Sequence, residues 1–390
     1  MKKLGISTVY TGYNYGSALQ AFAVKMICDE LGYASEVLHL GGSVIPGRDV
    51  RIGKAISIVL RLLRSPKKTL KIARTYADSL AKNAPVETQR LFNSFISEYI
   101  DPVITNWQEL KLLGKQSQYV AFLCGSDQIW NADTLYVDPQ YYLRYAPEYK
   151  RIAFAPSFGR HNVAEYNKRQ IGKYVEQIPF LSVREQTGVS IIKEIANRDA
   201  VWLLDPTLFF DKLQWIKYLG ISILPEEPRY LLAYFLDRPS EQAKICIQKI
   251  ARDKKLEIVS LPYRLENEDW FNRTSAAGPI EFVSILANAA FVCTDSFHGT
   301  AFSLIMQVPF YTFDREYGAA NKQSTRIESL LKLVDLCQRF CPSPDALKLS
   351  MNFDVCEKKL LEEKERTKAF LVSAISAIEN QREGENYGAK

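Results

Sequence analysis

The sequence lacks any long hydrophobic run, although 47% of its 390 residues are hydrophobic. No window reaches the roughly 18 apolar residues that a membrane-spanning helix requires. The first residues form a short apolar stretch without the hydrophobic core and small-residue cleavage site of a secretory signal peptide. We therefore expect a cytoplasmic protein. Low-complexity tracts are also absent, and a chain of this length predicts two domains.

Cysteine pairs that would suggest a disulfide framework are missing. The seven cysteines are odd in number and scattered, and several, such as Cys124 and Cys293, lie in apolar runs. This pattern is typical of reduced core thiols. Cys337 and Cys341 are close together but lack the second ligand pair of a zinc site.

Known cofactor fingerprints are missing as well. The glycine-flanked loop at residues 12–17 is neither a GxGxxG dinucleotide motif nor a Walker sequence. The few histidines occupy separate segments without the spacing of metal ligands: His39, His161 and His298. We therefore expect no metal and no bound cofactor.

Charge is modest overall, at a net +6, but uneven. Residues 51–82 contain nine basic residues against one acid, Asp78. Aliphatic residues are interleaved at roughly helical spacing, which predicts a basic amphipathic helical segment. Such a segment either lies on an anionic membrane surface, here the inner membrane face, or is an ordinary helical insertion that covers a cleft. No recognisable nucleic-acid-binding motif accompanies the charge, so we expect no nucleic-acid partner.

The hydrophobic pattern alternates between strands and helices, which predicts an α/β fold with two Rossmann-like domains facing each other across a cleft. Residues 1–210 are expected to form the first domain, with the basic helical insertion at 51–85. Its strands are predicted at 4–10, 34–40, 119–124, 151–155, 180–183 and 200–204, and its helices at 18–31, 87–99, 164–177 and 184–195. Ser17 with Gln20 three residues later predicts a capping box at the start of the first helix.

The same pattern restarts in residues 211–345, which are expected to form the second domain. Its strands are predicted at 230–235, 257–261, 291–294 and 310–313, and its helices at 241–253, 280–288, from 299 and around 325–333. Residues 346–390 contain a long, heavily charged helix over 352–382. Its aliphatic positions indicate one face packed on the body, and we expect it to cross back to the first domain.

The turn DSFHGT at residues 295–300 combines a carboxylate, hydroxyls, an imidazole and a glycine between a buried strand and a helix. Open α/β sheets keep their sites at such strand ends. The start of the helix favours an anion through its free N–H groups and its dipole. His298 is therefore a candidate acid or base over an anionic ligand. The alternative is a buried histidine with a local cap from Asp295 or Ser296.

A second polar cluster follows the predicted strand at 119–124. Asp127 and Gln128 suit hydroxyl groups, while Trp130 offers an apolar face, and these are the usual ingredients of sugar recognition. The alternative is a polar turn anchored by the tryptophan.

Three further residues, in two segments, carry positive charge near a predicted helix start. Arg184 suits a carboxylate or a phosphate, or else forms a structural pair with Glu185 or Asp205. Lys322 and Arg326 precede or open a helix, where they form either an anion grip or part of a solvated loop.

Six segments, in this order, resemble the polysaccharide pyruvyl transferase family. They are NYGSALQAFAVKMICDELG from Asn14, CGSDQIWN from Cys124, LSVREQTG from Leu181, LLDPTLFF from Leu203, TDSFHGTAFSLIMQVPF from Thr294 and NKQSTRIESLL from Asn321. The resemblance spans about residues 4–335. It implies a glycosyltransferase-B-like fold and transfer of a pyruvyl group from phosphoenolpyruvate, as co-substrate, onto two sugar hydroxyls. The product is a ketal on a capsule, cell-wall or exopolysaccharide unit.

The resemblance also implies roles for individual residues. His298 matches the family histidine and becomes the general acid/base, with Asp295 as a second catalytic residue. The donor-binding residues on this basis are Arg184, Ser296, Gly299, Thr300, Lys322 and Arg326. The acceptor-binding residues are Asn14, Ser17, Ser126, Asp127, Gln128, Trp130 and Asn131.

One departure from the family concerns the donor. Enzymes of this family can carry Arg-Leu-His where this chain has Ser296-Phe297-His298. Either Lys322 or Arg326 then supplies the missing charge, or the donor differs.

Two other functions remain open from the sequence. One is a nucleotide-sugar-dependent glycosyltransferase of the same architecture. The other is a non-catalytic sugar-binding protein of a polysaccharide assembly complex. For the transferase, the expected partners are phosphoenolpyruvate and a sugar or lipid-linked oligosaccharide acceptor.

Overall fold

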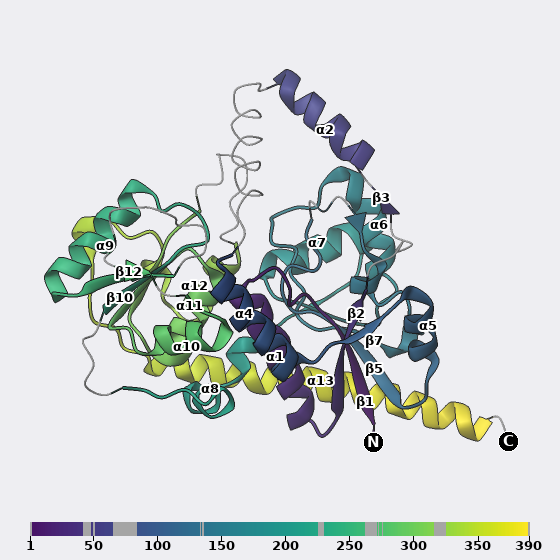
Figure 1. Ribbon diagram of the computed structural model, residues 1–390. Coiled ribbons are helices and arrows are strands. Elements are labelled where there is room, and N and C mark those ends of the chain that lie inside the picture. Colours follow the sequence, from purple (N-terminus) through teal and green to yellow (C-terminus); the bar gives the residue numbers. More distant parts are fainter. Residues whose placement is uncertain are drawn as a thin grey trace.

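Two α/β domains lie side by side in the computed structural model, and a long C-terminal helix runs beneath both (Figure 1). The structure describes residues 2–41, 48–49, 51–64, 84–132, 134, 136–224, 230–261, 271, 273–274, 276–315 and 325–388. Each domain is built on a parallel sheet covered by helices, as the alternating sequence pattern predicts.

The first domain contains a seven-stranded parallel sheet in the order β4-β2-β1-β5-β7-β8-β9. Its strands are β1 (Lys3–Ser7), β2 (Ala34–Leu40), β4 (Val103–Thr105), β5 (Tyr119–Cys124), β7 (Arg151–Ala153), β8 (Phe180–Val183) and β9 (Val201–Trp202). The helices are α1 (Tyr15–Glu30), α2 (Arg51–Arg64), α4 (Val86–Phe95), α5 (Trp107–Lys115), α6 (Glu165–Val175) and α7 (Gln186–Ala196). Every residue of β5 is buried, because helices cover both faces of a parallel sheet.

Shorter elements complete this domain. The strands β3 (Arg48–Asp49) and β6 (Tyr136–Val137) form an antiparallel pair. A π-helical turn, η1 (Ile96–Ile100), extends α4, and the 3₁₀ turns are η2 (Pro139–Tyr142), η3 (Glu148–Lys150) and η4 (Pro206–Phe209).

The second domain contains a five-stranded parallel sheet in the order β12-β11-β10-β13-β14. Its strands are β10 (Tyr230–Tyr234), β11 (Glu257–Ser260), β12 (Arg273–Thr274), β13 (Phe291–Thr294) and β14 (Phe310–Thr312). Its helices are α9 (Glu241–Lys254), α10 (Pro279–Ala287), α11 (Phe297–Met306) and α12 (Thr325–Leu333), with the short turns η5 (Cys337–Arg339) and η6 (Pro344–Ala346). The helix α8 (Lys212–Leu219) lies in the connection between the two sheets.

The first helix begins three residues earlier than predicted, and the capping box is wrong. Asn14 is the N-cap of α1, and its side chain accepts a hydrogen bond from the backbone N–H of Ser17 at 3.2 Å. Gln20 instead donates to Thr8 Oγ1 at 2.9 Å and accepts from the backbone N–H of Ser126 at 3.0 Å. The buried amide therefore connects two loops at the strand ends, and its further hydrogen bond to the Ser17 carbonyl, at 3.0 Å, is not the bond of a capping box.

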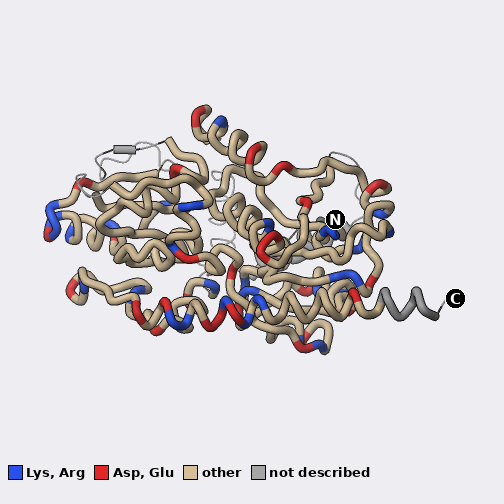
Figure 2. Tube along the Cα trace, turned by 90° about the horizontal axis from the view of Figure 1, so that it is seen from below, with Lys and Arg blue, Asp and Glu red and all other residues tan. Residues whose placement is uncertain are grey.

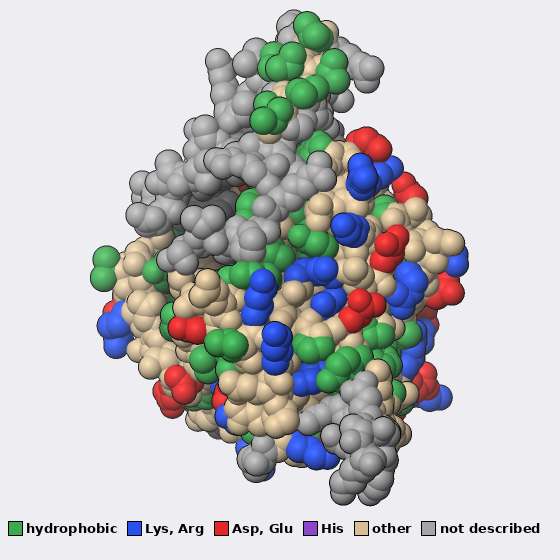
Figure 3. All heavy atoms as spheres, turned by 90° about the vertical axis from the view of Figure 1, so that its right-hand side faces the viewer, with side chains coloured by type: hydrophobic (Ala, Val, Ile, Leu, Met, Phe, Trp, Pro, Cys, Tyr) green, Lys and Arg blue, Asp and Glu red, His purple; other side chains and the backbone are tan. Residues whose placement is uncertain are grey.

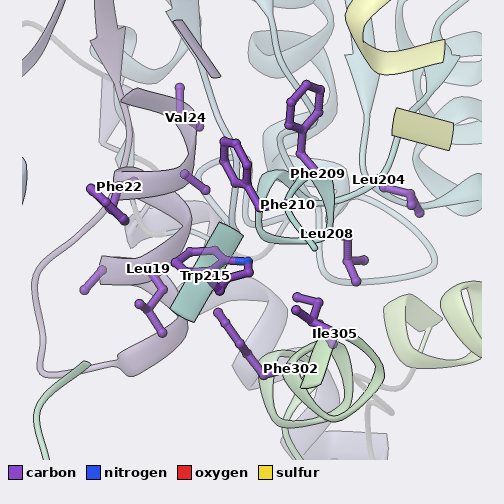
Figure 4. Packing of buried hydrophobic residues seen from close by; sticks show 14 of the residues in the cluster. Leu19, Phe22, Val24, Leu204, Leu208, Phe209, Phe210, Trp215, Phe302 and Ile305 are labelled. Carbon is purple, nitrogen blue, oxygen red and sulfur yellow. The ribbon is translucent and has the colours of Figure 1, made fainter. Parts of the chain in front are cut away.

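Aromatic side chains from both domains form a shared core (Figure 4). Trp215 of α8 contacts Phe22 of α1 and Phe302 of α11, with ring centroids 6.1 and 5.0 Å apart. Tyr15 of α1 stacks on Phe282 of α10 at 4.8 Å. Each buried aromatic contributes on the order of 1.5–3 kcal/mol. The two domains are thus held together by apolar packing next to the starts of α1 and α11.

The last helix, α13 (Asp354–Gly388), spans both domains, as the sequence predicts for a helix over residues 352–382. Near its start, Lys359 Nζ lies 2.6 Å from Asp335 of the second domain. Further along, Glu379 pairs with Lys2 of the first domain at 2.6 Å. Basic and acidic residues alternate along it (Figure 2). Among the described residues, no helix has the length and apolarity needed to span a membrane.

Candidate active site

The turn between β13 and α11 forms the second-domain side of the candidate site. Ser296 is the N-cap of α11, and its hydroxyl oxygen accepts the N–H of Gly299 at 3.3 Å. Thr300 is buried and donates its hydroxyl hydrogen bond to the Ser296 carbonyl at 3.0 Å. His298 therefore lies in the first turn of a helix whose free N–H groups and dipole face the same space.

The Asp295 carboxylate forms hydrogen bonds within its own domain. Its carboxylate accepts the backbone N–H groups of Leu236 at 2.6 Å and Asp237 at 2.9 Å, and the side chain of Arg315 lies 3.5 Å away. Burial raises the pKa of the Asp295 carboxyl to about 6. Asp295 thus joins the end of β10 to the end of β13, and the carboxylate that lies beside the His298 imidazole is a different one.

That carboxylate belongs to Asp205, at the start of η4 in the first domain. The distance from His298 Nε2 to Asp205 Oδ2 is 3.6 Å. The other carboxylate oxygen of Asp205 accepts the N–H and hydroxyl of Thr207 at 3.0 and 2.7 Å. Burial opposes the charge, but Arg184 and His298 outweigh it and hold the pKa of Asp205 well below its usual range. A fixed negative charge therefore stands next to the imidazole.

Arg184 is enclosed by carboxylates. Its guanidinium donates to Asp205 through one terminal nitrogen and to Asp127 through the other, the latter at 3.2 Å. Burial lowers the pKa of this guanidinium, but Asp205 and Asp127 more than compensate and raise it. Its charge is thus neutralised within the protein, which corresponds to the structural pair with Asp205 that the sequence left open.

Asp127 follows β5 and lies beside the start of α1, within the first domain. It adopts a left-handed conformation with φ of 59°, which is uncommon for residues other than glycine. Its carboxylate accepts the Ser17 hydroxyl at 2.5 Å, and Arg326 lies 4.0 Å away. Burial would raise the pKa of the Asp127 carboxyl, but the positive charge of Arg184 lowers it. Ser126, directly before it, is fully buried and donates to the Ala155 carbonyl at 2.8 Å.

These groups surround a cavity of about 520 Å³ between the domains. It is lined by Val9, Thr11, Gly12, Asn14, Ser17, Asp127, Gln128, Ile129, Asn131, Thr134, Tyr136, Val137, Asp138, Tyr141, Tyr142, Leu236, Ser296, Phe297, His298, Arg315 and Arg326. Both α1 and α11 begin here, so two helix N-termini meet at one cavity, an arrangement that favours an anion. A Cβ on Gly16 would lie 1.8 Å from His298 Nδ1, so the imidazole occupies space that only glycine leaves open.

Two arginines line this cavity from the second domain. Arg326, the second residue of α12, is buried, and both it and Arg184 contact the ring of Phe297, with guanidinium carbons 5.7 and 4.8 Å from the ring centroid. Burial, followed by the charge of Arg184, lowers the pKa of Arg326 to about 9. Arg315 donates to the Asp295 carbonyl at 3.2 Å. Lys322, predicted to act with Arg326, lies outside the described residues.

The structure separates the predicted acceptor residues into two groups. Five of them line the cavity: Asn14, Ser17, Asp127, Gln128 and Asn131. The other two, Ser126 and Trp130, are not among the residues that line it. Trp130 is fully buried, stacks on Tyr142 at 5.3 Å and donates its N–H to the Tyr141 carbonyl at 2.8 Å. Trp130 therefore anchors the turn from the protein interior. This corresponds to the alternative drawn from the sequence, a polar turn anchored by the tryptophan.

Sequence reasoning did not include Asp205 or Arg315 among the site residues. The sequence offers Asp205 only as a possible structural partner of Arg184 and within the Asp205-Pro206-Thr207 break after a strand, and neither signal connects it with His298. Arg315 follows β14 and carries no motif of its own. Among the described residues, no group of three His, Cys, Asp or Glu side chains is placed to hold a metal ion.

The fold has known counterparts. A putative UDP-N-acetylglucosamine 2-epimerase from Listeria monocytogenes superposes with a TM-score of 0.50 at 11% identity, covering 97% of this chain and 98% of that chain. A glycosyltransferase from Streptomyces nogalater gives a TM-score of 0.38 at 11% identity, with 98% of both chains covered. The likeness to the epimerase shows the fold, a glycosyltransferase-B-like arrangement of two facing Rossmann-like domains.

Sequence comparison gives the family. No curated protein matches the chain significantly. The family model for polysaccharide pyruvyl transferase matches residues 14–317, which include the starts of α1 and α11 and all the groups around His298. The chain belongs to the polysaccharide pyruvyl transferase family.

Proposed function

We propose that this protein transfers a pyruvyl group from phosphoenolpyruvate to two hydroxyls of a sugar in a capsule, cell-wall or exopolysaccharide unit. The observation that carries the proposal is the position of His298, which lies at an inter-domain cavity where two helices begin, in a chain of this family. The product is a cyclic ketal, and inorganic phosphate leaves.

The donor carries a carboxylate and a phosphate, and the second-domain side of the cavity supplies positive potential. Arg326 is the better candidate to contact it, because Arg184 is already neutralised by Asp127 and Asp205. The lowered pKa of Arg326 indicates a cation that lacks full compensation, so an anion beside it would be stabilising. Arg315 and the N–H groups at the starts of α1 and α11 complete this anion site.

The reaction needs a proton donor first and a proton acceptor afterwards. Protonation of the donor methylene gives a methyl group and makes the central carbon electrophilic. One sugar hydroxyl adds to this carbon and loses its proton, and the second hydroxyl then displaces phosphate. His298 is suited to give and take these protons, since a neutral imidazole holds one nitrogen with a proton and one without.

Asp205 acts through His298. With one oxygen held by Thr207 and the other near Nε2, it would orient the imidazole and stabilise its protonated form. Asp205 is therefore a positioning residue in this proposal. On the acceptor side, Asp127, Gln128 and Asn131 offer polar groups to sugar hydroxyls along the first-domain wall.

The proposal is tested by phosphate release from phosphoenolpyruvate over a panel of lipid-linked and nucleotide-linked sugars, with ketal formation followed by mass spectrometry. We expect phosphate and pyruvylated sugar in equal amounts, and activity that survives thorough chelation. Absence of phosphate release, combined with Mg²⁺-dependent release of a nucleoside diphosphate, would instead establish a nucleotide-sugar-dependent glycosyltransferase. Acceptor binding without any turnover would indicate a sugar-binding protein.

A further inference from the structure

The helix α2 (Arg51–Arg64) projects away from both domains (Figure 1). Six of its large apolar side chains are exposed, from 37% for Leu62 to 80% for Ile52. Figure 3 shows hydrophobic side chains gathered on this projection, at the top of the molecule. In contrast, Leu371, Ile375 and Ile378 of α13 are buried, as expected for a helix that packs on the body. The apolar side of α2 is therefore not covered by any element among the described residues.

The exposed residues follow a helical spacing. Five of them, Ile52, Ile56, Val59, Leu60 and Leu63, fall on one face of an α-helix, and the sixth, Leu62, falls beside this face. By the same spacing, the four basic residues fall on the rest of the circumference: Arg51, Lys54, Arg61 and Arg64. The helix contains no acidic residue. It is thus a cationic amphipathic helix with an unpartnered apolar face.

We propose that α2 binds the surface of an anionic phospholipid membrane, with its apolar face at the acyl boundary and its basic residues among the headgroups. Both halves of the helix then find a complementary environment. A second copy of this chain fits less well, because pairing two α2 helices would bring eight positive charges together without an acid. Nucleic acid would satisfy the charge but would leave the apolar face exposed. This inference is independent of the proposed chemistry.

The experiment is co-sedimentation of the full-length protein with vesicles of phosphatidylcholine, with and without phosphatidylglycerol. We expect binding to the anionic vesicles at low salt, weakened by added salt. Replacing Arg61 and Arg64 by Gln should reduce partitioning roughly five-fold for each residue, since a basic residue near the surface adds about 1 kcal/mol.

A matched pair of variants shows whether vesicle binding depends on the apolar face of α2 or on exposed apolar side chains in general. Ile52→Ser with Leu63→Ser removes side chains that are 80% and 78% exposed, and should abolish vesicle binding. Leu112→Ser with Leu213→Ser removes side chains on α5 and α8 that are 63% and 75% exposed, and should leave binding unchanged. Both variants should keep wild-type activity on a water-soluble acceptor.

Three outcomes would overturn the proposal. The first is a wild type that ignores anionic vesicles at low salt. The second is equal binding to neutral and anionic vesicles, which would leave no role for the basic residues. The third is concentration-dependent dimerisation in light scattering that the Ile52→Ser, Leu63→Ser variant removes, which would identify a second copy as the occupant.

Discussion

The two walls of the cavity use their charged groups differently. On the first-domain wall, Arg184 is paired with Asp127 and Asp205 before any substrate arrives. Behind the second-domain wall, the Asp295 carboxylate accepts backbone N–H groups, and on the wall itself His298 Nε2 has no hydrogen-bond partner among the described residues. On the first-domain wall the charged groups are therefore already paired with one another, whereas on the second-domain wall this imidazole nitrogen has no such partner among the described residues.

This difference has a structural consequence. His298 comes from α11, while Asp205 and Gly16, which define its surroundings, come from the other domain. The imidazole therefore has a carboxylate neighbour only when the domains are packed together. Substitutions at His298, Asp205 and Gly16 alter this contact itself, whereas substitutions at Arg326 and Arg184 alter the charges around it.

The largest effect is expected for His298→Ala. Removing the proton shuttle should lower turnover by roughly 10²–10⁴-fold, the usual contribution of a general acid/base. The fold should be retained, because the imidazole fills the space that Gly16 leaves open and the smaller alanine side chain fits there. Steady-state phosphate release measures the loss, and His161→Ala, at an exposed position, is the matched control. Near-normal turnover would remove His298 from the mechanism.

Asp205→Asn should destabilise the cluster of paired charges on the first-domain wall. It leaves Arg184 short of one carboxylate, and breaking a buried pair costs about 3–5 kcal/mol of unfolding free energy. Because the folded pKa of Asp205 is depressed, its contribution is present above the unfolded pKa of about 3.9 and is lost as pH falls below it. Chemical denaturation should therefore show a gap between wild type and variant at pH 7 that narrows below pH 4. A gap independent of pH would contradict the ion-pair assignment.

Gly16→Ala tests the contact between the domains directly. The new methyl group would overlap His298 Nδ1, so the imidazole or the domains must shift. A misplacement of about 1 Å can cost on the order of 10²-fold in turnover. We expect this loss with a smaller change in stability than in Asp205→Asn, measured by kinetics and denaturation of the same preparation. Unchanged turnover would show that the present contact is not the reacting arrangement.

Arg326→Met should have the smallest effect and sharpen the contrast between a paired and an available cation. Hydrogen bonds to charged groups contribute about 1.5–3 kcal/mol, so the donor KM should rise roughly ten-fold or more while the acceptor KM changes little. Arg184→Met should instead lower the unfolding free energy, since it leaves Asp127 and Asp205 without their cation. Arg252→Met on the surface of α9 serves as the control. An equal response of both KM values would place the donor elsewhere.

The sequence was sufficient to locate the strands that carry the site. The predicted strands at 119–124, 180–183 and 291–294 coincide with β5, β8 and β13. Buried parallel strands are continuous apolar runs, and the polar residues that follow them stand out for that reason. The turn containing His298 was located in the same way.

The pairing of Arg184 with Asp205 was one of the alternatives that the sequence offered, but the partner of His298 was not predictable. Asp205 and His298 belong to different domains, so no local spacing connects them. Gln20 and Trp130 carried the correct local signals for a cap and for a sugar platform, but tertiary packing turned both inward. Residue types indicate which chemistry is available at a strand end, whereas the orientation of each side chain depends on neighbours that are distant in the chain.

The helix α13 links the two domains that form this site. It measures about 52 Å at 1.5 Å per residue for its 35 residues, and it contacts the second domain at Lys359 and the first at Glu379. No described residue of α13 lines the cavity, yet one continuous helix is attached to both of the domains that do. We therefore expect changes at these two attachment points to affect the distance from His298 to Asp205 without removing any group from the site.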